Sequence, residues 1–222
     1  MAARAPELTR PLRTAPHRVF LLSPADCSGK RARLLQKPDP SHDLGRRLHG
    51  EDGAELGEVF SFVSSLYFRG KLAYARAFAR PPEHVAGVHV ITPCEGLKTP
   101  ESPLRLRDLL RYAGVPVDPE EKRYRVPLLR DLRALAPAWA DAEVVLLGSV
   151  ASRKYVELLT SVLDSRLLFP SDFVGRGDMS RGGLMLRCVQ ERRELPYVAL
   201  LGAERRGPRP ARLPPAARTS AS

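Results

Sequence analysis

The chain is poor in cysteine, and the three that it has, Cys27, Cys94 and Cys188, are far apart. None lies in a Cys-x-x-Cys pair or at a zinc-ligand spacing from a histidine. A sparse, odd count argues against a disulfide framework, and the missing spacings argue against a structural zinc site. We therefore expect a protein of the reducing cytoplasm that has no bound metal and no cofactor.

Long hydrophobic runs are absent as well. No apolar run approaches the ~20 residues of a membrane-spanning helix, and no hydrophobic signal core follows the basic N-terminus. We therefore expect no membrane segment. Aromatic residues make up only 6% of the chain whereas hydrophobic residues make up 43%, so Leu, Val and Ala must fill most of a core.

Familiar catalytic motifs are also missing. The sequence has no GxxxxGK[ST] or HExxH motif, and its carboxylates are too scattered to name an acid/base pair. YFRGK (67–71) has the Tyr-x-x-x-Lys spacing of short-chain dehydrogenases, but SPADCSGK (23–30) lacks the glycine-rich turn that binds their dinucleotide. His89 is the only histidine in a predicted strand, where we expect a hydrogen-bonded structural role.

Basic residues are in excess, with a formal net charge of +11 over 222 residues. Residues 1–18 carry +3 of this charge and residues 202–222 carry +4, so the middle of the chain is only mildly basic. Such a charge attracts nucleic acid by counterion release, but charged tails also simply keep a protein soluble, and both alternatives stay open. The Pro- and Arg-rich segments 1–16 and 202–222 lack periodicity and are predicted to be disordered tails.

The remaining segment, 17–201, is predicted to be a single α/β domain with a mostly parallel central sheet flanked by helices. Apolar runs at 17–23, 87–93 and 143–149 are typical of strands that are covered on both faces. Weaker strand patterns lie at 166–169 and 197–201. Helical periodicity alternates with the strands, which favours this fold class. The predicted helices are 56–68, 70–79, 103–114, 128–140 and 152–164.

Three turns follow the predicted central strands, at 23–32, 92–103 and 148–155. Each combines small residues, hydroxyls or a thiol with a lysine, and parallel strands bring such turns to one edge of the sheet. Backbone N–H groups and lysines in such turns bind anions, although strand-to-helix turns commonly have this composition without a ligand.

Individual candidates follow from these turns and from the helix beside them. The residues predicted to bind an anion or nucleic acid here are Ser28, Lys30, Arg69, Lys71, Ser152 and Tyr155. Arg69 and Lys71 form a basic helix face, which is alternatively a solvated face. Cys27 is a candidate catalytic nucleophile if a helix N-terminus lowers its pKa, and otherwise a small structural thiol.

Residues 173–187, FVGRGDMSRGGLMLR, combine four glycines with three arginines just before an apolar segment. We interpret FVGRGDMSRGG (173–183) as a mobile anion-binding loop, anchored by the apolar residues that follow it, in which Arg176 and Arg181 donate and Ser180 caps a helix or touches phosphate. Asp178 is a second catalytic candidate. The glycines permit close backbone approach, and Gly177 is the position considered for a positive φ, which a β-branched side chain would strain. The alternative is a plain glycine-rich connection.

Taken in order, several of these segments resemble the YaaA peroxide-stress family and related small uncharacterised bacterial α/β proteins. The segments that carry the resemblance are LLSPAD (21–26), LYFRGK (66–71), EGLKTPESP (95–103), GSVASRKY (148–155) and RGDMSRGGLM (176–185). The resemblance implies DNA binding and a role in limiting oxidative damage. Asp26 stands where the family usually has a lysine, and no catalytic role transfers to a particular residue.

Three functional hypotheses stay open. The first is a nucleic-acid- or nucleotide-binding protein that uses the shared sheet edge and the Gly/Arg loop. The second is an enzyme acting on a nucleotide or nucleobase at the same site, and the third is an accessory protein that binds a partner through its tails. The expected partner is nucleic acid or a phosphorylated small molecule, and the oligomeric state is left open.

Overall fold

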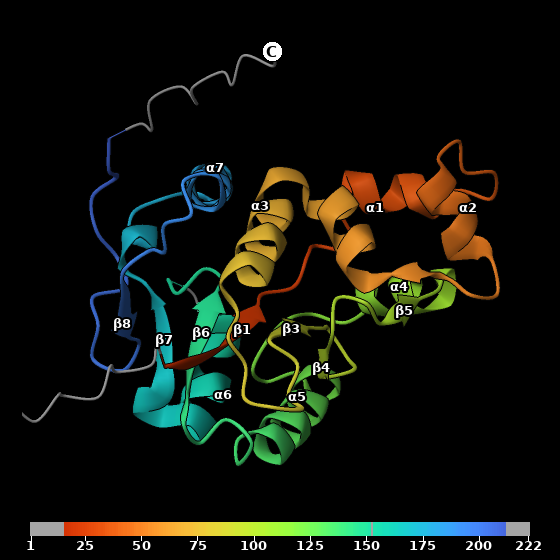
Figure 1. The fold of residues 1–222 in the computed structure, drawn as a ribbon. Helices are drawn as coiled ribbons and strands as arrows, with labels where there is room; N and C mark the ends of the chain where they lie inside the picture. The colour runs from red at the N-terminus through yellow and green to blue at the C-terminus, as the bar shows by residue number, and fades with distance from the viewer. Residues whose placement is uncertain (1–15, 152, 212–222) are drawn as a thin grey trace, which may run out of the picture.

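The apolar runs at 17–23, 87–93 and 143–149 form the centre of one sheet. The computed structural model describes residues 16–151 and 153–211 (Figure 1). Across the sheet the strands are β4 (Leu97–Lys98), β3 (Val88–Ile91), β1 (His17–Leu22), β6 (Ala142–Leu147), β7 (Leu167–Pro170) and β8 (Tyr197–Ala199). The four inner strands are parallel and the two edge strands are antiparallel to their neighbours. The predicted fold class is therefore confirmed.

Strand β1 lies at the middle of this sheet and is buried on both faces. It pairs with β6 along its whole length and with β3 on its other side. Phe20 and Leu22 point into one hydrophobic core, whereas Val19 and Leu21 point into the other. This two-sided burial explains why the strand has a continuous apolar run rather than alternating polar residues.

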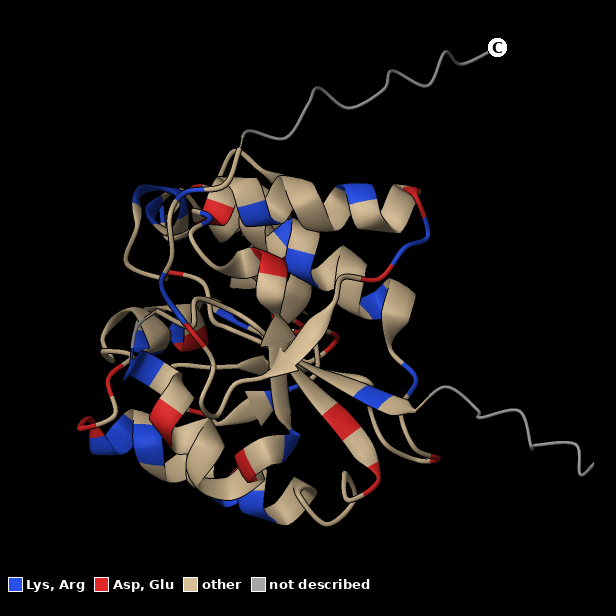
Figure 2. Ribbon diagram, turned by 90° about the vertical axis from the view of Figure 1, so that its left-hand side faces the viewer, with Lys and Arg blue, Asp and Glu red and all other residues tan. Residues whose placement is uncertain are grey.

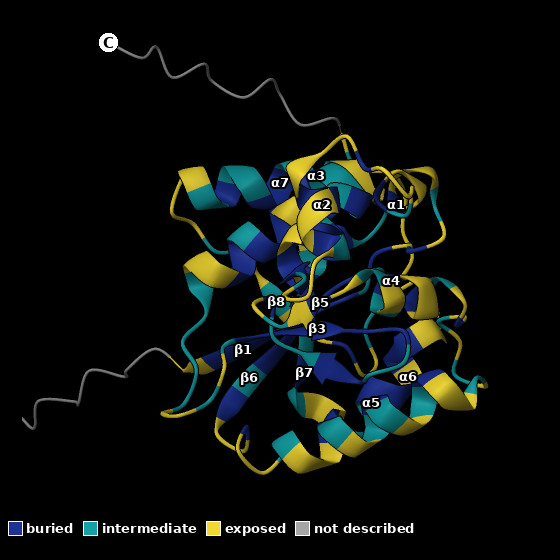
Figure 3. Ribbon diagram, turned by 90° about the vertical axis from the view of Figure 1, so that its right-hand side faces the viewer, coloured by how far each residue is buried: buried dark blue, intermediate teal, exposed yellow. Residues whose placement is uncertain are grey.

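Helices cover both faces of the sheet (Figures 1 and 3). The first core is covered by α1 (Lys30–Leu35), α2 (Asp43–His49), α3 (Leu56–Phe78), α4 (Leu106–Ala113) and α7 (Asp178–Gln190). The second core is covered by α5 (Lys122–Leu135) and α6 (Arg153–Leu163). A two-stranded sheet of β2 (Ala54–Glu55) and β5 (Pro103–Leu104) and two short 3-10 turns, Asp164–Arg166 and Ser171–Phe173, complete the described structure.

The helices differ from their predicted bounds for local reasons. The two helices predicted at 56–68 and 70–79 form one element, α3, which is broken at Ser65, where φ is 52° and ψ is −130°. Helix α4 begins later than predicted because Pro103–Leu104 pairs with β2. Helix α5 begins earlier than predicted, at Lys122, and ends at Leu135, before Pro137.

The predicted glycine-arginine loop is wrong from Asp178 onward, because Asp178–Gln190 forms helix α7. Its glycines serve a helix crossing: a Cβ on Gly182 would lie 2.6 Å from the Leu66 carbonyl oxygen, and one on Gly70 would lie 2.6 Å from that of Gly182. Helices α3 and α7 therefore pack backbone against backbone. The positive φ is not at Gly177, where φ is −80°, but at Gly175, where it is +71°.

The predicted tails lie mainly outside the described residues, which exclude 1–15 and 212–222. The described part of the second tail has no helix or strand beyond Ala199. It is nevertheless in contact with the domain. Ala203 packs against the second core, and the Pro208 carbonyl oxygen lies 2.1 Å from where a Cβ on Gly175 would be.

Candidate ligand-binding site

A pocket of about 650 Å³ opens where the central strands end. Ser23 follows β1, Pro93 follows β3 and Ser149 follows β6, and all three line the pocket. Helices α3 and α7 contribute Tyr67 and Asp178. The three predicted turns therefore meet at one edge of the sheet, as parallel strands require.

Lys71 lies directly behind the floor of this pocket and is completely buried. Its ammonium donates hydrogen bonds to the Ser23 carbonyl oxygen at 2.6 Å and to Ser23 Oγ at 2.9 Å. The same nitrogen lies 4.6 Å from the centre of the Tyr67 ring and 4.8 Å from that of Phe68. The side chain is therefore held between two aromatic rings and presented to Ser23.

The environment of Lys71 disfavours its charged form. Among the described residues Lys71 forms no ion pair, and Asp178 acts on it only through its charge. Burial lowers the pKa of Lys71 to about 7, an effect that Asp178 partly opposes and Arg181 reinforces. The amine thus exchanges its proton near neutral pH, as functional lysines in dry pockets do.

Arg181 lies behind the pocket and acts on Tyr67, which lines it. The Arg181 guanidinium is buried, donates twice to the Phe173 carbonyl oxygen, at 3.2 and 3.1 Å, and pairs with Asp178 at 3.4 Å. The Tyr67 hydroxyl is buried and has no hydrogen bond of normal geometry among the described residues. Burial raises the pKa of Tyr67, although the charge of Arg181 and a hydrogen bond to it act in the opposite direction, so this hydroxyl stays protonated.

Gly148 has no room for a side chain, because Ser23 and Tyr155 lie against it at the floor of the pocket. A Cβ at this position would lie 2.9 Å from the Tyr155 hydroxyl and 3.1 Å from Ser23 Oγ. The two hydroxyls therefore border the same small space at the end of β6. Burial raises the pKa of Tyr155, and the Ser23 side chain lowers it in part.

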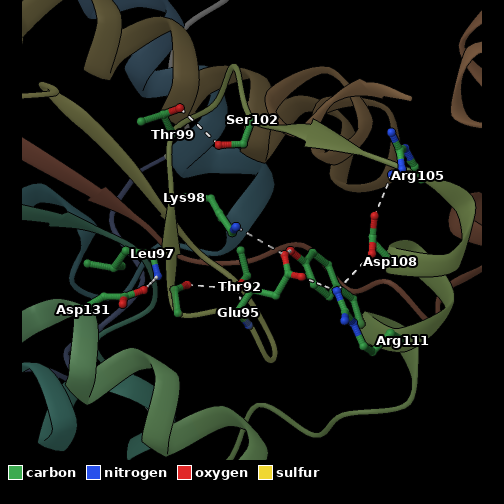
Figure 4. A network of polar contacts seen from close by, with 12 residues as sticks. Thr92, Glu95, Leu97, Lys98, Thr99, Ser102, Arg105, Asp108, Arg111 and Asp131 are labelled. Atoms are coloured by element: carbon green, nitrogen blue, oxygen red, sulfur yellow. Dashed lines mark hydrogen bonds and ion pairs between the residues drawn. The ribbon is translucent and has the colours of Figure 1, made fainter. Parts of the chain in front are cut away.

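A polar network fixes the wall that follows β3 (Figure 4). Tyr112, which lines the pocket, donates to Glu95 at 2.7 Å, and Arg111 also pairs with Glu95. Asp131 accepts from the Leu97 amide at 2.9 Å. The turn after β3 is thereby tied to α4 and α5, which makes this wall part of the rigid scaffold.

The sequence-predicted residues divide into three groups. Ser28, Tyr155 and Asp178 line the pocket, and Lys71 and Arg181 lie behind it. The pocket lining does not include the other described candidates, which are Cys27, Lys30, Arg69, Arg176 and Ser180. Ser152 lies outside the described residues.

Two of these candidates have other roles in the structure. Arg176 donates to the Asp172 carbonyl oxygen at 2.9 Å and contacts Ser180 Oγ at 3.3 Å, so the two residues partner one another. Cys27 is buried, and burial raises the pKa of its thiol to about 12. The lowered pKa that would make Cys27 a nucleophile is therefore absent, and its environment is that of a structural thiol.

Sequence reasoning missed Ser23 and the Tyr67 hydroxyl. Ser23 is the first residue after β1. Ligands bind beyond the carboxyl ends of parallel strands, so the position of Ser23 in the sequence could have indicated its place in the site. No sequence signal marks the missing hydrogen bond of Tyr67. It results from the packing of α7 on α3.

The described residues contain no group of three or more His, Cys, Asp or Glu side chains that would hold a metal ion. Among the same residues, no helix has the length and apolar character needed to cross a bilayer. Acidic and basic segments are interspersed along the helices in Figure 2.

Comparison with known proteins finds no family model, no curated protein and no solved structure that matches the chain. The resemblance to the YaaA family therefore stays a prediction.

Proposed function

We propose that the pocket binds a nucleobase-containing small molecule and that the protein is an enzyme acting on it. The observation that carries this proposal is the buried amine of Lys71, with its lowered pKa, bonded to Ser23 at the wall of a pocket that Tyr67 also lines. Buried ionisable groups with a strongly shifted pKa are frequent at functional sites, because burial that costs stability is retained there.

The lining of the pocket favours a planar, hydrogen-bonding ligand over a bare phosphate. Three tyrosines, Tyr67, Tyr112 and Tyr155, supply aromatic surface together with hydroxyl groups. The charged residues at the surface of the pocket are of both signs, with Asp26 and Asp178 opposing Lys154. A base fits such walls, and a phosphate attached to it would be drawn to the Lys154 side.

A thermal-shift and calorimetric screen of nucleobases, nucleosides, nucleotides and inorganic phosphate tests this proposal. A ligand that binds the folded state raises the melting temperature by mass action. We expect at least one base-containing ligand to bind and phosphate alone to bind far more weakly. Failure of every base-containing ligand, with binding of phosphate alone, would contradict the proposal.

A matched pair of tyrosine variants locates the ligand. The hydroxyls of Tyr67 and Tyr124 are both buried without partners, but Tyr124 does not line the pocket. Tyr67→Phe should weaken binding about tenfold by removing one hydrogen bond, whereas Tyr124→Phe should leave affinity unchanged. Equal affinities in the two variants would place the ligand elsewhere.

Nucleic acid is the second candidate ligand, and the net charge of +11 favours it. Binding through this charge would be uniform across sequences and would fall steeply with salt. Short single-stranded DNA in the same screen separates the alternatives. Salt-sensitive DNA binding that Tyr67→Phe leaves intact would support the second candidate and not the pocket.

A further inference from the structure

Ser23 and Lys71 are paired at the floor of the pocket in the geometry of a nucleophile and its base. Lys71 Nζ lies 2.9 Å from Ser23 Oγ, and Ser23 lines the pocket. We infer that Ser23 is a catalytic nucleophile, that Lys71 is its general base, and that the substrate carries an ester or amide carbonyl. This inference rests on the proposed pocket and names the reaction class, but it does not depend on which base the ligand contains.

Lys71 is suited to accept the serine proton because of what surrounds it. The hydroxyl and carbonyl oxygen of Ser23 face the amine from the end of β1, and the Tyr67 and Phe68 rings face it from α3. From α7 the charges of Asp178 and Arg181 act on it in opposite directions. Within the part of the chain that the structure describes, Lys71 has no ion pair that would lock the amine in its protonated form. Serine–lysine pairs use such an amine as the base.

The neighbouring nucleophiles lack this arrangement. The Ser28 hydroxyl donates at 2.7 Å to Asp26, whose carboxylate also caps the Ser28 amide at 3.0 Å, so this pair closes a turn. The Cys27 thiol contacts the Ala25 carbonyl oxygen at 3.6 Å, and burial together with the charge of Asp26 raises its pKa. Ser23 is thus the hydroxyl in this turn that has an amine within hydrogen-bonding distance.

The reaction proceeds in two steps, acylation of Ser23 and hydrolysis of the acyl-serine. Ser23 Oγ forms a bond to the carbonyl carbon, its proton moves to Lys71, and the bond to the leaving alcohol or amine breaks as Lys71 returns that proton to it. Water then attacks the acyl-serine, again giving a proton to Lys71, and the carboxylic acid leaves as Ser23 regains its proton.

Two phenols are placed to stabilise the negative oxygen that forms in both steps. The Tyr67 hydroxyl is unpartnered, and the Tyr155 hydroxyl borders the same space as Ser23 Oγ. Burial keeps both phenols protonated, so they act as hydrogen-bond donors. Preorganised donors of this kind contribute strongly where charge develops.

Labelling of the full chain with a small alkyl fluorophosphonate tests the pair without any knowledge of the substrate. Ser23 Oγ would displace fluoride from phosphorus, and intact mass and peptide mapping would locate one adduct on Ser23. The labelling rate should rise with pH through about 7, as Lys71 loses its proton. Ser23→Ala should abolish the adduct, and Lys71→Met should slow labelling by about 100-fold or more.

Matched controls lie outside the pocket on neighbouring helices. Ser161→Ala on α6 and Lys122→Met on α5 should label at the parental rate. Labelling that is unchanged in Lys71→Met, or an adduct on another residue, would overturn the inference. Absence of any adduct at every pH would overturn it as well, while ligand binding by the same protein would leave the proposed function intact.

Discussion

A buried cationic side chain lies at each end of strand β1, and the surroundings of the two side chains shift their pKa values in opposite directions. At its start, Arg18 is bonded to Glu143 and Glu194 and lies 4.6 Å from the centre of the Tyr197 ring. Burial lowers the pKa of Arg18, but the two carboxylates outweigh this effect and leave it raised. Beyond its end, Lys71 has hydrogen bonds to Ser23 but no carboxylate partner, and its pKa is lowered to about 7.

This difference separates a structural charge from a functional one. A buried cation with carboxylate partners closes the amino-terminal edge of the sheet at little cost. A buried amine without such partners lowers the stability of the folded protein. Such groups are therefore frequent at functional sites, where their chemistry is used. The carboxyl edge, which holds Lys71, is also the edge where the pocket opens.

The largest effect on stability is expected from a substitution that forces α7 away from α3. Helix α7 also carries Asp178 and Arg181, the two charges that act on Lys71. Gly182→Val should destabilise the fold by more than about 3 kcal/mol, because its Cβ would meet the Leu66 carbonyl at 2.6 Å. Gly183→Ala is the control, since a Cβ there meets nothing within 4 Å. Denaturant unfolding of both variants checks this, and equal stabilities would mean that the helix crossing is looser than described.

Arg18→Met should have the next largest effect. It leaves Glu143 and Glu194 without their shared partner and should lower the free energy of unfolding by about 2–3 kcal/mol near neutral pH. Urea denaturation measures this loss. A stability equal to that of the parent would remove the contrast between the two ends of β1.

Lys71→Met should act in the opposite direction and depend on pH. Below about pH 7 the folded chain bears the full cost of a buried ammonium, so the variant should be more stable by about 1–3 kcal/mol. Between about 7 and the usual 10.5 the folded chain loses this proton before the unfolded chain does, so parental stability rises with pH. Parental stability rises by about 1.4 kcal/mol per pH unit in this range, so the advantage of the variant should vanish between about pH 8 and 9. A constant difference across this range would contradict a titrating Lys71.

The smallest effect is expected at Arg176. Its side chain contacts the Asp172 carbonyl and Ser180 and does not line the pocket. Arg176→Ala should change stability by no more than about 0.5 kcal/mol and should leave the affinity for the pocket ligand unchanged. A tenfold weaker affinity, measured by calorimetry, would restore the sequence-based assignment of Arg176 to the site.

The sheet could be predicted because each central strand has its own local pattern of continuous apolar residues. The meeting of the three turns at one edge of the sheet could be predicted from the parallel pairing of these strands alone. Helix α7 was missed because Gly182 and Gly183 disfavour an isolated helix, and only the contact of Gly182 with α3 explains why a glycine is needed there. The pairing of Ser23 with Lys71 was missed because these residues are 48 positions apart and only the packing of α3 against the end of β1 brings them together.

The central claim is that Lys71 exchanges its proton near neutral pH inside an otherwise closed core. An NMR titration of the Lys71 side-chain carbon next to the amine, assigned by its loss in Lys71→Met, measures this directly. The account predicts a midpoint near 7. A midpoint near about 10.4, the value of an unperturbed lysine, would show that the amine is solvated or paired and would contradict the account.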